Sequence, residues 1–207
     1  MTGCGCEVDI KDASQRNVLV ALLMINALMF VVELGFGWVA ESTALIADSL
    51  DMLADAVVYG IGLYAVGRSM KHKANAALLS GYFQGALGLL IVFDIARRVW
   101  MGSEPRSELM IIVGFAALVA NVICLLLMQK HRNGEVHMRA SWIFSKNDVI
   151  ANIGVMTAGG LVAMSGSRWP DILIGLIVAT VILRGARSIV VDAKKTLADS
   201  SVGCQNV

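Results

Sequence analysis

Three aspartates lie at the front of an otherwise apolar stretch of the sequence. Asp48, Asp51 and Asp55 fall within "ALIADSLDMLAD", and the next eleven residues, "AVVYGIGLYAV", carry no charge. Since an α-helix turns by about 100° per residue, spacings of three and four place all three carboxyl groups on one face. The helix macrodipole could account for Asp48 and even Asp51, but its effect fades within a turn and Asp55 lies deeper. The pair Asp51 and Asp55 therefore indicates a functional role.

A second apolar stretch, "SWIFSKNDVIANIGVMTAGGLVAM", is interrupted by polar residues near its start. Ser145, Asp148 and Asn152 recur at spacings of three and four, which again places them on one face of a helix. Lys146 lies on a different face and is expected to extend toward the membrane surface. In the alternative interpretation, Asp148 only neutralises Lys146.

Carboxyl groups on two such helices can enclose one small cation. Divalent metals take carboxylate oxygens as ligands, and Asp51, Asp55 and Asp148 would supply three negative charges. Without metal these groups would repel one another, so protons are expected to occupy the site and to leave when metal enters. That exchange is the physical basis of a metal/proton antiporter.

Two cysteines near the N-terminus are further candidates. Cys4 and Cys6 form a Cys-x-Cys pair that offers two soft ligands and could capture a thiophilic ion. A reduced tail without a metal role is the alternative. With Cys124 and Cys204, the four cysteines do not have the spacing of a disulfide framework.

The composition indicates that membrane helices position these residues. The 207 residues are 57% hydrophobic and only 16% charged, with a mean hydropathy of +0.71. In soluble domains, about a quarter of the residues are charged. Since a helix needs about 20 apolar residues to cross the hydrocarbon core, the sequence predicts six spans. They are Val18–Val39, Ala44–Val66, Ala76–Val99, Glu108–Met128, Trp142–Met164 and Asp171–Val191.

Short connections between these spans predict an all-α membrane protein, a six-transmembrane-helix bundle. We expect a tail at residues 1–16, a transmembrane domain at 17–192 and a second short tail at 193–207. With both termini cytoplasmic, 12 of the 17 Lys and Arg residues lie inside, and one, Lys146, lies within the fifth span. The four outside are Arg97, Arg98, Arg106 and Arg168. Both termini are therefore predicted to be cytoplasmic, in the inner membrane if the protein is bacterial.

These stretches resemble the cation diffusion facilitator family of divalent-metal/proton antiporters. The segment "VVELGFGWVAESTALIADSLDMLAD" is similar to the family's first-to-second-helix signature, with Asp51 and Asp55 at its two ligand positions. "MRASWIFSKNDVIANIGV" resembles its fifth helix, with Asp148 on the family's Asp and Asn152 on its Ser, and "RWPDILIGLIVATVILRGARSIVVDAKKTL" resembles its sixth. The resemblance implies efflux of a divalent metal in exchange for protons: zinc first, with cadmium, cobalt or manganese as alternatives.

The sequence departs from that family in two respects. Phe144 stands where the fifth-helix histidine is expected, so Ser145, Asn147, Asn152 or a water would have to replace that ligand. Without an imidazole the site is harder in character, which weakens the zinc assignment. The sequence also ends about sixteen residues after Val191, so compared with that family we expect a short member lacking the C-terminal domain.

The resemblance implies a homodimer, which the membrane helices would then have to hold together. Gly81 and Gly85, in "GYFQGALG", form a stripe of small residues that could mediate this contact, or could equally pack against a helix of the same chain. Glu33 and Asn121 are expected to make interhelical hydrogen bonds or to line a water path.

Two other functions are compatible with intramembrane acids. One is a proton-coupled exporter of small cationic compounds, although aromatic walls around a single acid would suit such an exporter better than three clustered acids. The other is a membrane scaffold whose acids only pair with Lys146 or Arg184. The sequence has no arrangement of nucleophile, base and oxyanion donors that would predict an enzyme, and no prosthetic group is expected. A net charge of +1 gives no reason to expect a nucleic-acid partner.

Overall fold

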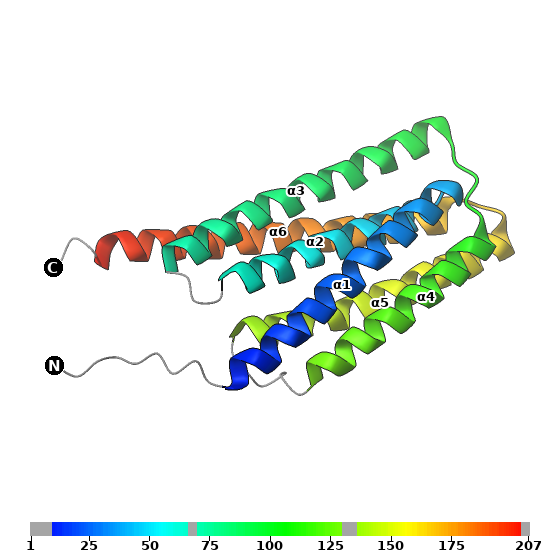
Figure 1. The fold of residues 1–207 in the computed structure, drawn as a ribbon. Helices are drawn as coiled ribbons and strands as arrows, with labels where there is room; N and C mark the ends of the chain where they lie inside the picture. Colours follow the sequence, from blue (N-terminus) through cyan, green and yellow to red (C-terminus); the bar gives the residue numbers. More distant parts are fainter. Residues whose placement is uncertain (1–9, 66–69, 130–135, 204–207) are drawn as a thin grey trace, which may run out of the picture.

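The computed structural model describes residues 10–65, 70–129 and 136–203 of the chain. In these ranges it contains six α-helices and no strand (Figure 1). The helices are α1 (Ile10–Val39), α2 (Thr43–Ala65), α3 (Met70–Met101), α4 (Ser107–Met128), α5 (Val136–Ser165) and α6 (Trp169–Gly203). The prediction of an all-helical bundle is confirmed for this part of the chain.

Each predicted span corresponds to one helix, but several helices continue beyond the apolar runs. α5 begins at Val136 rather than Trp142, and α6 extends to Gly203 rather than ending at Val191. Backbone hydrogen bonds can continue into polar sequence once a helix is nucleated, so the apolar run marks only its membrane-compatible part.

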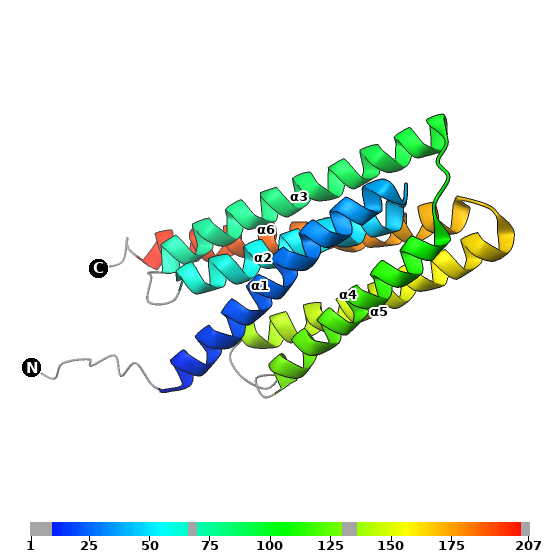
Figure 2. The same ribbon diagram turned by 45° about the vertical axis from the view of Figure 1, so that its right-hand side comes forward.

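The helices pack in three antiparallel pairs with all connections at the two ends of the bundle. α3 packs along α6, α1 along α2, and α4 along α5 (Figure 2). The first and last helices have their free ends at the same end of the bundle. The α1–α2, α3–α4 and α5–α6 connections lie at the opposite end (Figure 1).

The glycine stripe of α3 faces α6 of the same chain. A Cβ atom at Gly81 would lie 2.7 Å from Cγ2 of Val190, and one at Gly88 would lie 2.6 Å from Cδ2 of Leu183. The absence of side chains therefore allows the two helices to approach closely. Of the two interpretations of this stripe, packing within the chain is the one observed, with Gly81 against Val190 and Gly85 facing Ala186.

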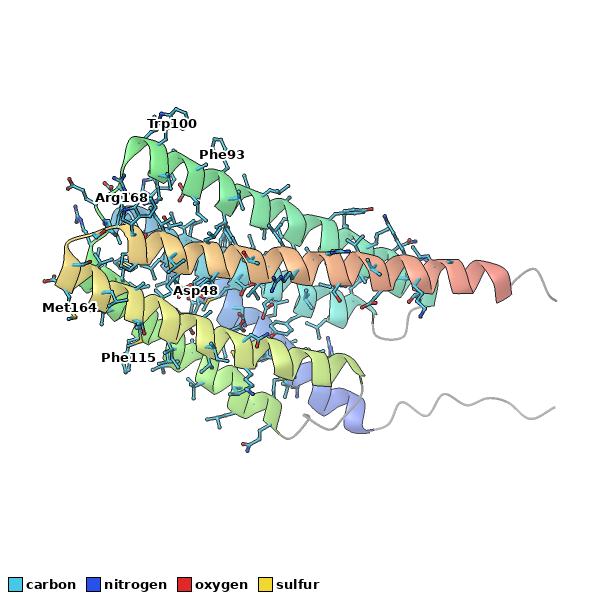
Figure 3. The ribbon with its side chains drawn as sticks, turned by 180° about the vertical axis from the view of Figure 1, so that it is seen from behind. Asp48, Phe93, Trp100, Phe115, Met164 and Arg168 are labelled. Atoms are coloured by element: carbon cyan, nitrogen blue, oxygen red, sulfur yellow. The ribbon has the colours of Figure 1, made fainter. Side chains whose placement is uncertain are left out.

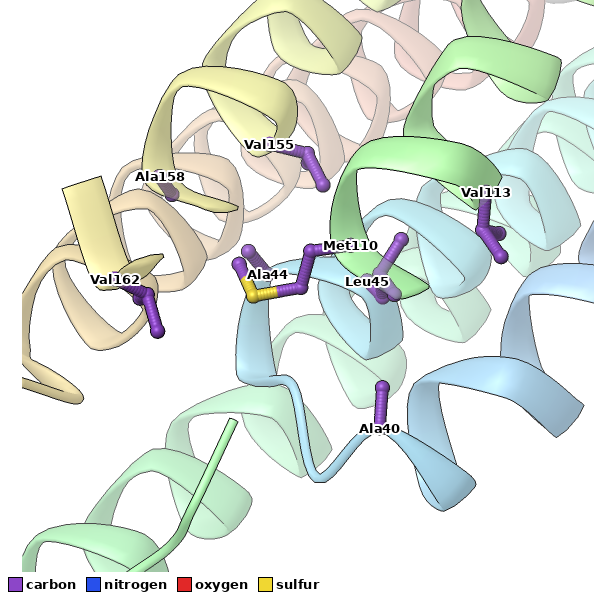
Figure 4. Close-up of a cluster of buried hydrophobic side chains, with 8 residues drawn as sticks. All are labelled: Ala40, Ala44, Leu45, Met110, Val113, Val155, Ala158 and Val162. Carbon is purple, nitrogen blue, oxygen red and sulfur yellow. The ribbon is translucent and has the colours of Figure 1, made fainter. Parts of the chain in front are cut away.

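Small and branched apolar side chains close the end of the bundle opposite the termini. Met110 of α4 lies among side chains from the α1–α2 turn, α2 and α5 (Figure 4). The buried members of this cluster are Ala40, Ala44, Leu45, Met110, Val113, Val155, Ala158 and Val162. Their packing joins the α4–α5 pair to the start of α2.

The surface of the bundle is apolar, and its interior contains charged residues. Phe93, Trp100, Phe115 and Met164 project outward, whereas Asp48 lies within the bundle (Figure 3). Trp100 and Met164 are 92% and 86% exposed, which would be costly in water but not in lipid. Trp38, Trp100 and Trp169 are all exposed near the end opposite the termini, as in the aromatic belt of a membrane protein.

Five helices in the described part of the chain are long and apolar enough to cross a membrane: α1, α3, α4, α5 and α6. α2, the sixth predicted span, is not among them because it carries three aspartates. It contacts all five other helices and so occupies the centre of the bundle. A central helix can carry acids that a lipid-facing helix could not.

Candidate metal centre

The start of α2 is held in place by a side chain of α6. Asp171 is fully buried, and it accepts hydrogen bonds from Ser42 Oγ (2.6 Å) and from the backbone N–H groups of Thr43 (2.7 Å) and Ala44 (3.0 Å). Ser42 Oγ in turn accepts from the N–H of Leu45 at 3.1 Å. These bonds satisfy donors that a helix start leaves free. The three aspartates of α2 are therefore not needed as its N-terminal cap.

Asp55 of α2 and Asp148 of α5 lie in direct contact inside the bundle. Only 7% and 8% of these residues are exposed, and their carboxyl groups are within hydrogen-bonding reach of each other. Two carboxyl groups can approach so closely only when a proton or a cation lies between them. The contact joins the two acid-bearing faces that the sequence predicts.

Tyr59 and Ser145 complete this pair on the side toward the chain termini. The Tyr59 hydroxyl donates to Asp55 Oδ2 at 3.2 Å and lies 3.5 Å from Ser145 Oγ. Both residues are 1% exposed. Ser145 is thus the candidate replacement ligand that the structure places beside the acids. Tyr59 was not identified from the sequence, although its position four residues after Asp55 places it on the same helix face.

Asp51 is close to both neighbouring aspartates of α2 but faces a cavity. It is half-buried, its carboxylate interacts electrostatically with those of Asp55 and Asp48, and it lines a cavity of about 320 Å³ bounded by α5 and α6. Asn147 lines the same cavity. In the described residues, no three Asp, Glu, His or Cys side chains converge to hold an ion in this arrangement. A three-carboxylate site would require Asp51 to turn toward Asp55 and Asp148.

Asp48 and Asn152 belong to a separate polar group, one helical turn nearer the end opposite the termini. Asn152 Nδ2 donates to Asp48 Oδ2 at 2.5 Å, and Asn152 Oδ1 accepts from Asn121 at 2.8 Å. The amide of Asn152 is therefore bonded to Asp48 and Asn121, so it is not free to act as a fourth ligand in this arrangement. The interhelical hydrogen bond predicted for Asn121 is observed.

Glu33 of α1 lies next to this group, but no described residue donates a hydrogen bond to it. It is fully buried beside Asp48, and neither carboxylate oxygen has a hydrogen-bond donor among the described residues. The expected interhelical contact of Glu33 is thus with another acid, which requires a shared proton or cation.

No basic side chain that the structure describes neutralises these acids. The ion pairs in the described part of the chain join Asp94 to Arg97 and to Arg98, at 2.7 Å and 2.6 Å. Lys146 and Arg184 are both exposed and form no ion pair there. The two pairings that a scaffold would use are absent from the described residues.

Three sequence-based candidates cannot be placed. Cys4 and Cys6 lie outside the described residues, as does the side chain of Phe144. Asp171 was not recognised as a site residue, because nothing near it in the sequence indicates that it caps a helix 129 residues earlier.

Comparison with known proteins finds a family match that covers most of the chain. Residues 19–198 match the cation efflux transmembrane domain. The chain is 28% identical over 190 residues to the zinc transporter ZitB of Yersinia pseudotuberculosis, a match that covers 85% of this chain and 60% of that protein.

Two further relatives have similar coverage. The cadmium, cobalt and zinc/H(+)-K(+) antiporter of Bacillus subtilis is 23% identical over 88% of this chain and 63% of its own. The metal cation efflux system protein CzcD of Cupriavidus metallidurans is 24% identical, with 84% and 60% covered. The chain thus spans about three-fifths of the length of the curated relatives that it matches.

Proposed function

Because the chain belongs to the cation efflux family, a family of membrane transporters and not of enzymes, we propose that it exports a divalent transition metal in exchange for protons. The observation that carries this proposal is the buried contact between Asp55 and Asp148, with Asp51 beside it and with no basic partner among the described residues. Such a group is held together either by protons or by a cation, and alternation between the two is antiport.

The proposed ligands are Asp51, Asp55 and Asp148, with Ser145 as a fourth oxygen. When metal enters, the protons shared by the carboxyl groups leave, and Asp51 turns from the cavity to complete the site. The Tyr59 hydroxyl holds Asp55 in position. Alternating access to the two sides of the membrane would then let external protons displace the metal.

Zinc is the proposed substrate, with cadmium, cobalt or manganese as alternatives. The printed names of the relatives include zinc, cadmium and cobalt. An all-oxygen ligand set is harder than one with an imidazole, which shifts preference toward manganese. Cys4 and Cys6 could deliver a soft ion to this site.

In the proposed topology all six helices cross the membrane, and both termini are cytoplasmic. The four arginines Arg97, Arg98, Arg106 and Arg168 lie near the other end, which would be the outer side. The protein is proposed to work as a homodimer, by analogy with the implied family arrangement. Its interface would have to exclude the glycine stripe of α3.

Metal-driven proton flux in proteoliposomes tests this function. Zinc, cadmium, cobalt and manganese are added to one side, and an internal pH-sensitive dye reports proton release. We expect a response from the wild type and its loss in Asp55→Asn and Asp148→Asn. Asp192→Asn, an exposed acid of α6, is the matched control and should transport normally. Absence of a response to every metal, or full activity of Asp55→Asn, would contradict the proposal.

A further inference from the structure

We infer that the cavity beside Asp51 binds a monovalent organic cation with a short alkyl chain, and that this cation excludes metal from the site. The cavity lies between α5 and α6, with Asp51 of α2 at its inner side, and has a volume of about 320 Å³. That volume falls at the lower end of the range of small-molecule pockets.

Charge and wall chemistry identify the ligand class. Asp51 is the acid that lines the cavity, Asn147 is its second polar residue, and the remaining lining residues are aliphatic or glycine. A divalent metal inside the cavity would have too few oxygen ligands. A monovalent ammonium group can take the place of the proton on Asp51, while its alkyl chain lies along Ile174, Val178 and Val181. Such a cation matches the single acid and the apolar wall of the cavity.

The residue types that line the cavity favour an alkyl cation over an aromatic one. The lining contains no aromatic side chain, so a ring would have no stacking partner there. Ile150 and Ile177 are 59% and 50% exposed, so the cavity has an edge on the outer surface of the bundle. An amphipathic cation that has partitioned into the bilayer can therefore reach Asp51 between α5 and α6.

Competition with metal rests on the proposed function, because it assumes that Asp51 turns toward Asp55 and Asp148 to bind metal. An ammonium group on Asp51 would hold this carboxylate in the cavity. The bound alkyl cation should then weaken metal binding and slow transport, while the binding of the alkyl cation itself does not depend on transport.

Binding of butyl-, hexyl- and octyltrimethylammonium to the protein in lipid nanodiscs tests the inference, with empty nanodiscs subtracted. These probes are permanently charged, so they do not carry protons across membranes. We expect each added methylene to strengthen binding about fourfold until the cavity is full. Octanol, which has the same chain without the charge, should bind at least tenfold more weakly.

Cavity-filling variants supply the structural control. A Cβ atom at Gly154 would meet Ile174 at an ordinary 3.6 Å, so the side chain of Gly154→Leu can extend into the cavity. Val181→Phe fills it from the opposite wall. Both should lower affinity for the octyl cation at least tenfold, as should Asp51→Asn. Gly160→Leu is the matched control, because no atom lies within 4 Å of a Cβ at Gly160 and this residue is not part of the cavity lining.

The outcomes separate this inference from the proposed function. Equal binding of octanol and the octyl cation, or unchanged binding in both filling variants or in Asp51→Asn, would overturn the cavity assignment even if metal transport is normal. Conversely, an octyl cation that binds to the wild type and is lost in these three variants supports the cavity site, even if no metal is transported.

Discussion

The hydroxyl group of Ser42 donates a 2.6 Å hydrogen bond to Asp171, a residue 129 positions later in the chain. The same carboxylate accepts two backbone N–H groups at the start of α2, so a side chain of α6 caps the helix that carries Asp51 and Asp55. A Cβ at Gly175, one turn after Asp171, would lie 2.7 Å from Cγ2 of Thr43, which shows how closely the two helices approach. Movement of α6 must therefore either carry the start of α2 with it or break this cap.

Removal of the Asp171 carboxylate should destabilise the protein. Asp171→Ala leaves Ser42 and two buried N–H groups without an acceptor, so we expect the free energy of unfolding to fall by about 3 kcal/mol. Asp171→Asn keeps one acceptor oxygen and should cost about half as much. Unfolding in mixed micelles measures both variants. Asp192→Ala, on the exposed face of the same helix, should change stability by less than about 0.5 kcal/mol. Equal stability of Asp171→Ala and the wild type would show that the cap contributes nothing.

The Tyr59 hydroxyl should influence metal affinity more than stability. Tyr59→Phe keeps the buried ring but removes the hydroxyl that donates to Asp55. Loss of this hydrogen bond should cost about 1 kcal/mol of binding free energy. We therefore expect the KM for metal to rise about fivefold while the expression level and unfolding midpoint stay close to wild type. Tyr82→Phe, at an exposed tyrosine of α3, is the control. The role assigned to Tyr59 fails if both variants have the same KM as the wild type.

Asn152 should couple α2 to α4 through its two hydrogen bonds. Asn152→Ala leaves Asp48 and Asn121 without their amide partner inside the bundle, so it should cost about 3 kcal/mol. In a double-mutant cycle with Asn121→Ala, the two changes should be non-additive by about 1 kcal/mol. Additive losses would indicate that the amides act independently, contrary to the observed bond between them.

The Asp55–Asp148 contact and the hydrogen bonds of Asn152 illustrate what the sequence could and could not predict. The six helices follow from the length of the apolar runs, and the facing of Asp55 and Asp148 follows from spacings of three and four. The partner of Asn152 does not follow from spacing, because spacing groups Asn152 with Asp148 on its own helix and does not predict contacts with other helices. In the structure the amide nitrogen of Asn152 donates to Asp48, and its amide oxygen accepts from Asn121 of α4.

The sequence likewise does not predict which helices pack against one another. The Gly81 and Gly85 pattern predicts that a helix approaches closely, but it does not say whether that helix belongs to the same chain. The cap by Asp171 joins residues that are distant in sequence. From the sequence alone, Asp171 looks like an ordinary acid in the first turn of its own helix. Tyr59, in contrast, was predictable, because its spacing of four from Asp55 is the same criterion that grouped the aspartates.

Replacement of Glu33 by glutamine should stabilise the protein. Neither oxygen of Glu33 has a donor among the described residues, and its neighbour Asp48 is also an acid. The glutamine side chain can donate an amide N–H to Asp48 without the shared proton or cation that two acids require, so Glu33→Gln should raise the free energy of unfolding by about 1 kcal/mol at neutral pH. Glu33→Ala, which removes the same carboxyl group without supplying a donor and leaves a cavity, should lower it by about 2 kcal/mol. If glutamine destabilises as much as alanine, Glu33 must have a partner that its surroundings do not reveal.

Restoring an imidazole at position 144 should shift metal selectivity. In the resemblance to the cation diffusion facilitators, Phe144 occupies the position of a histidine four residues before Asp148. Phe144→His would add a softer nitrogen ligand, so transport of zinc should improve at least tenfold relative to manganese. Competition between the two metals in proteoliposomes measures this ratio. Ile143→His, about 100° away around the helix, should leave the ratio unchanged. If both histidine variants shift the ratio equally, the effect arises from an added surface ligand and not from the metal site. If neither does, the fifth helix does not present position 144 to the acids of α2.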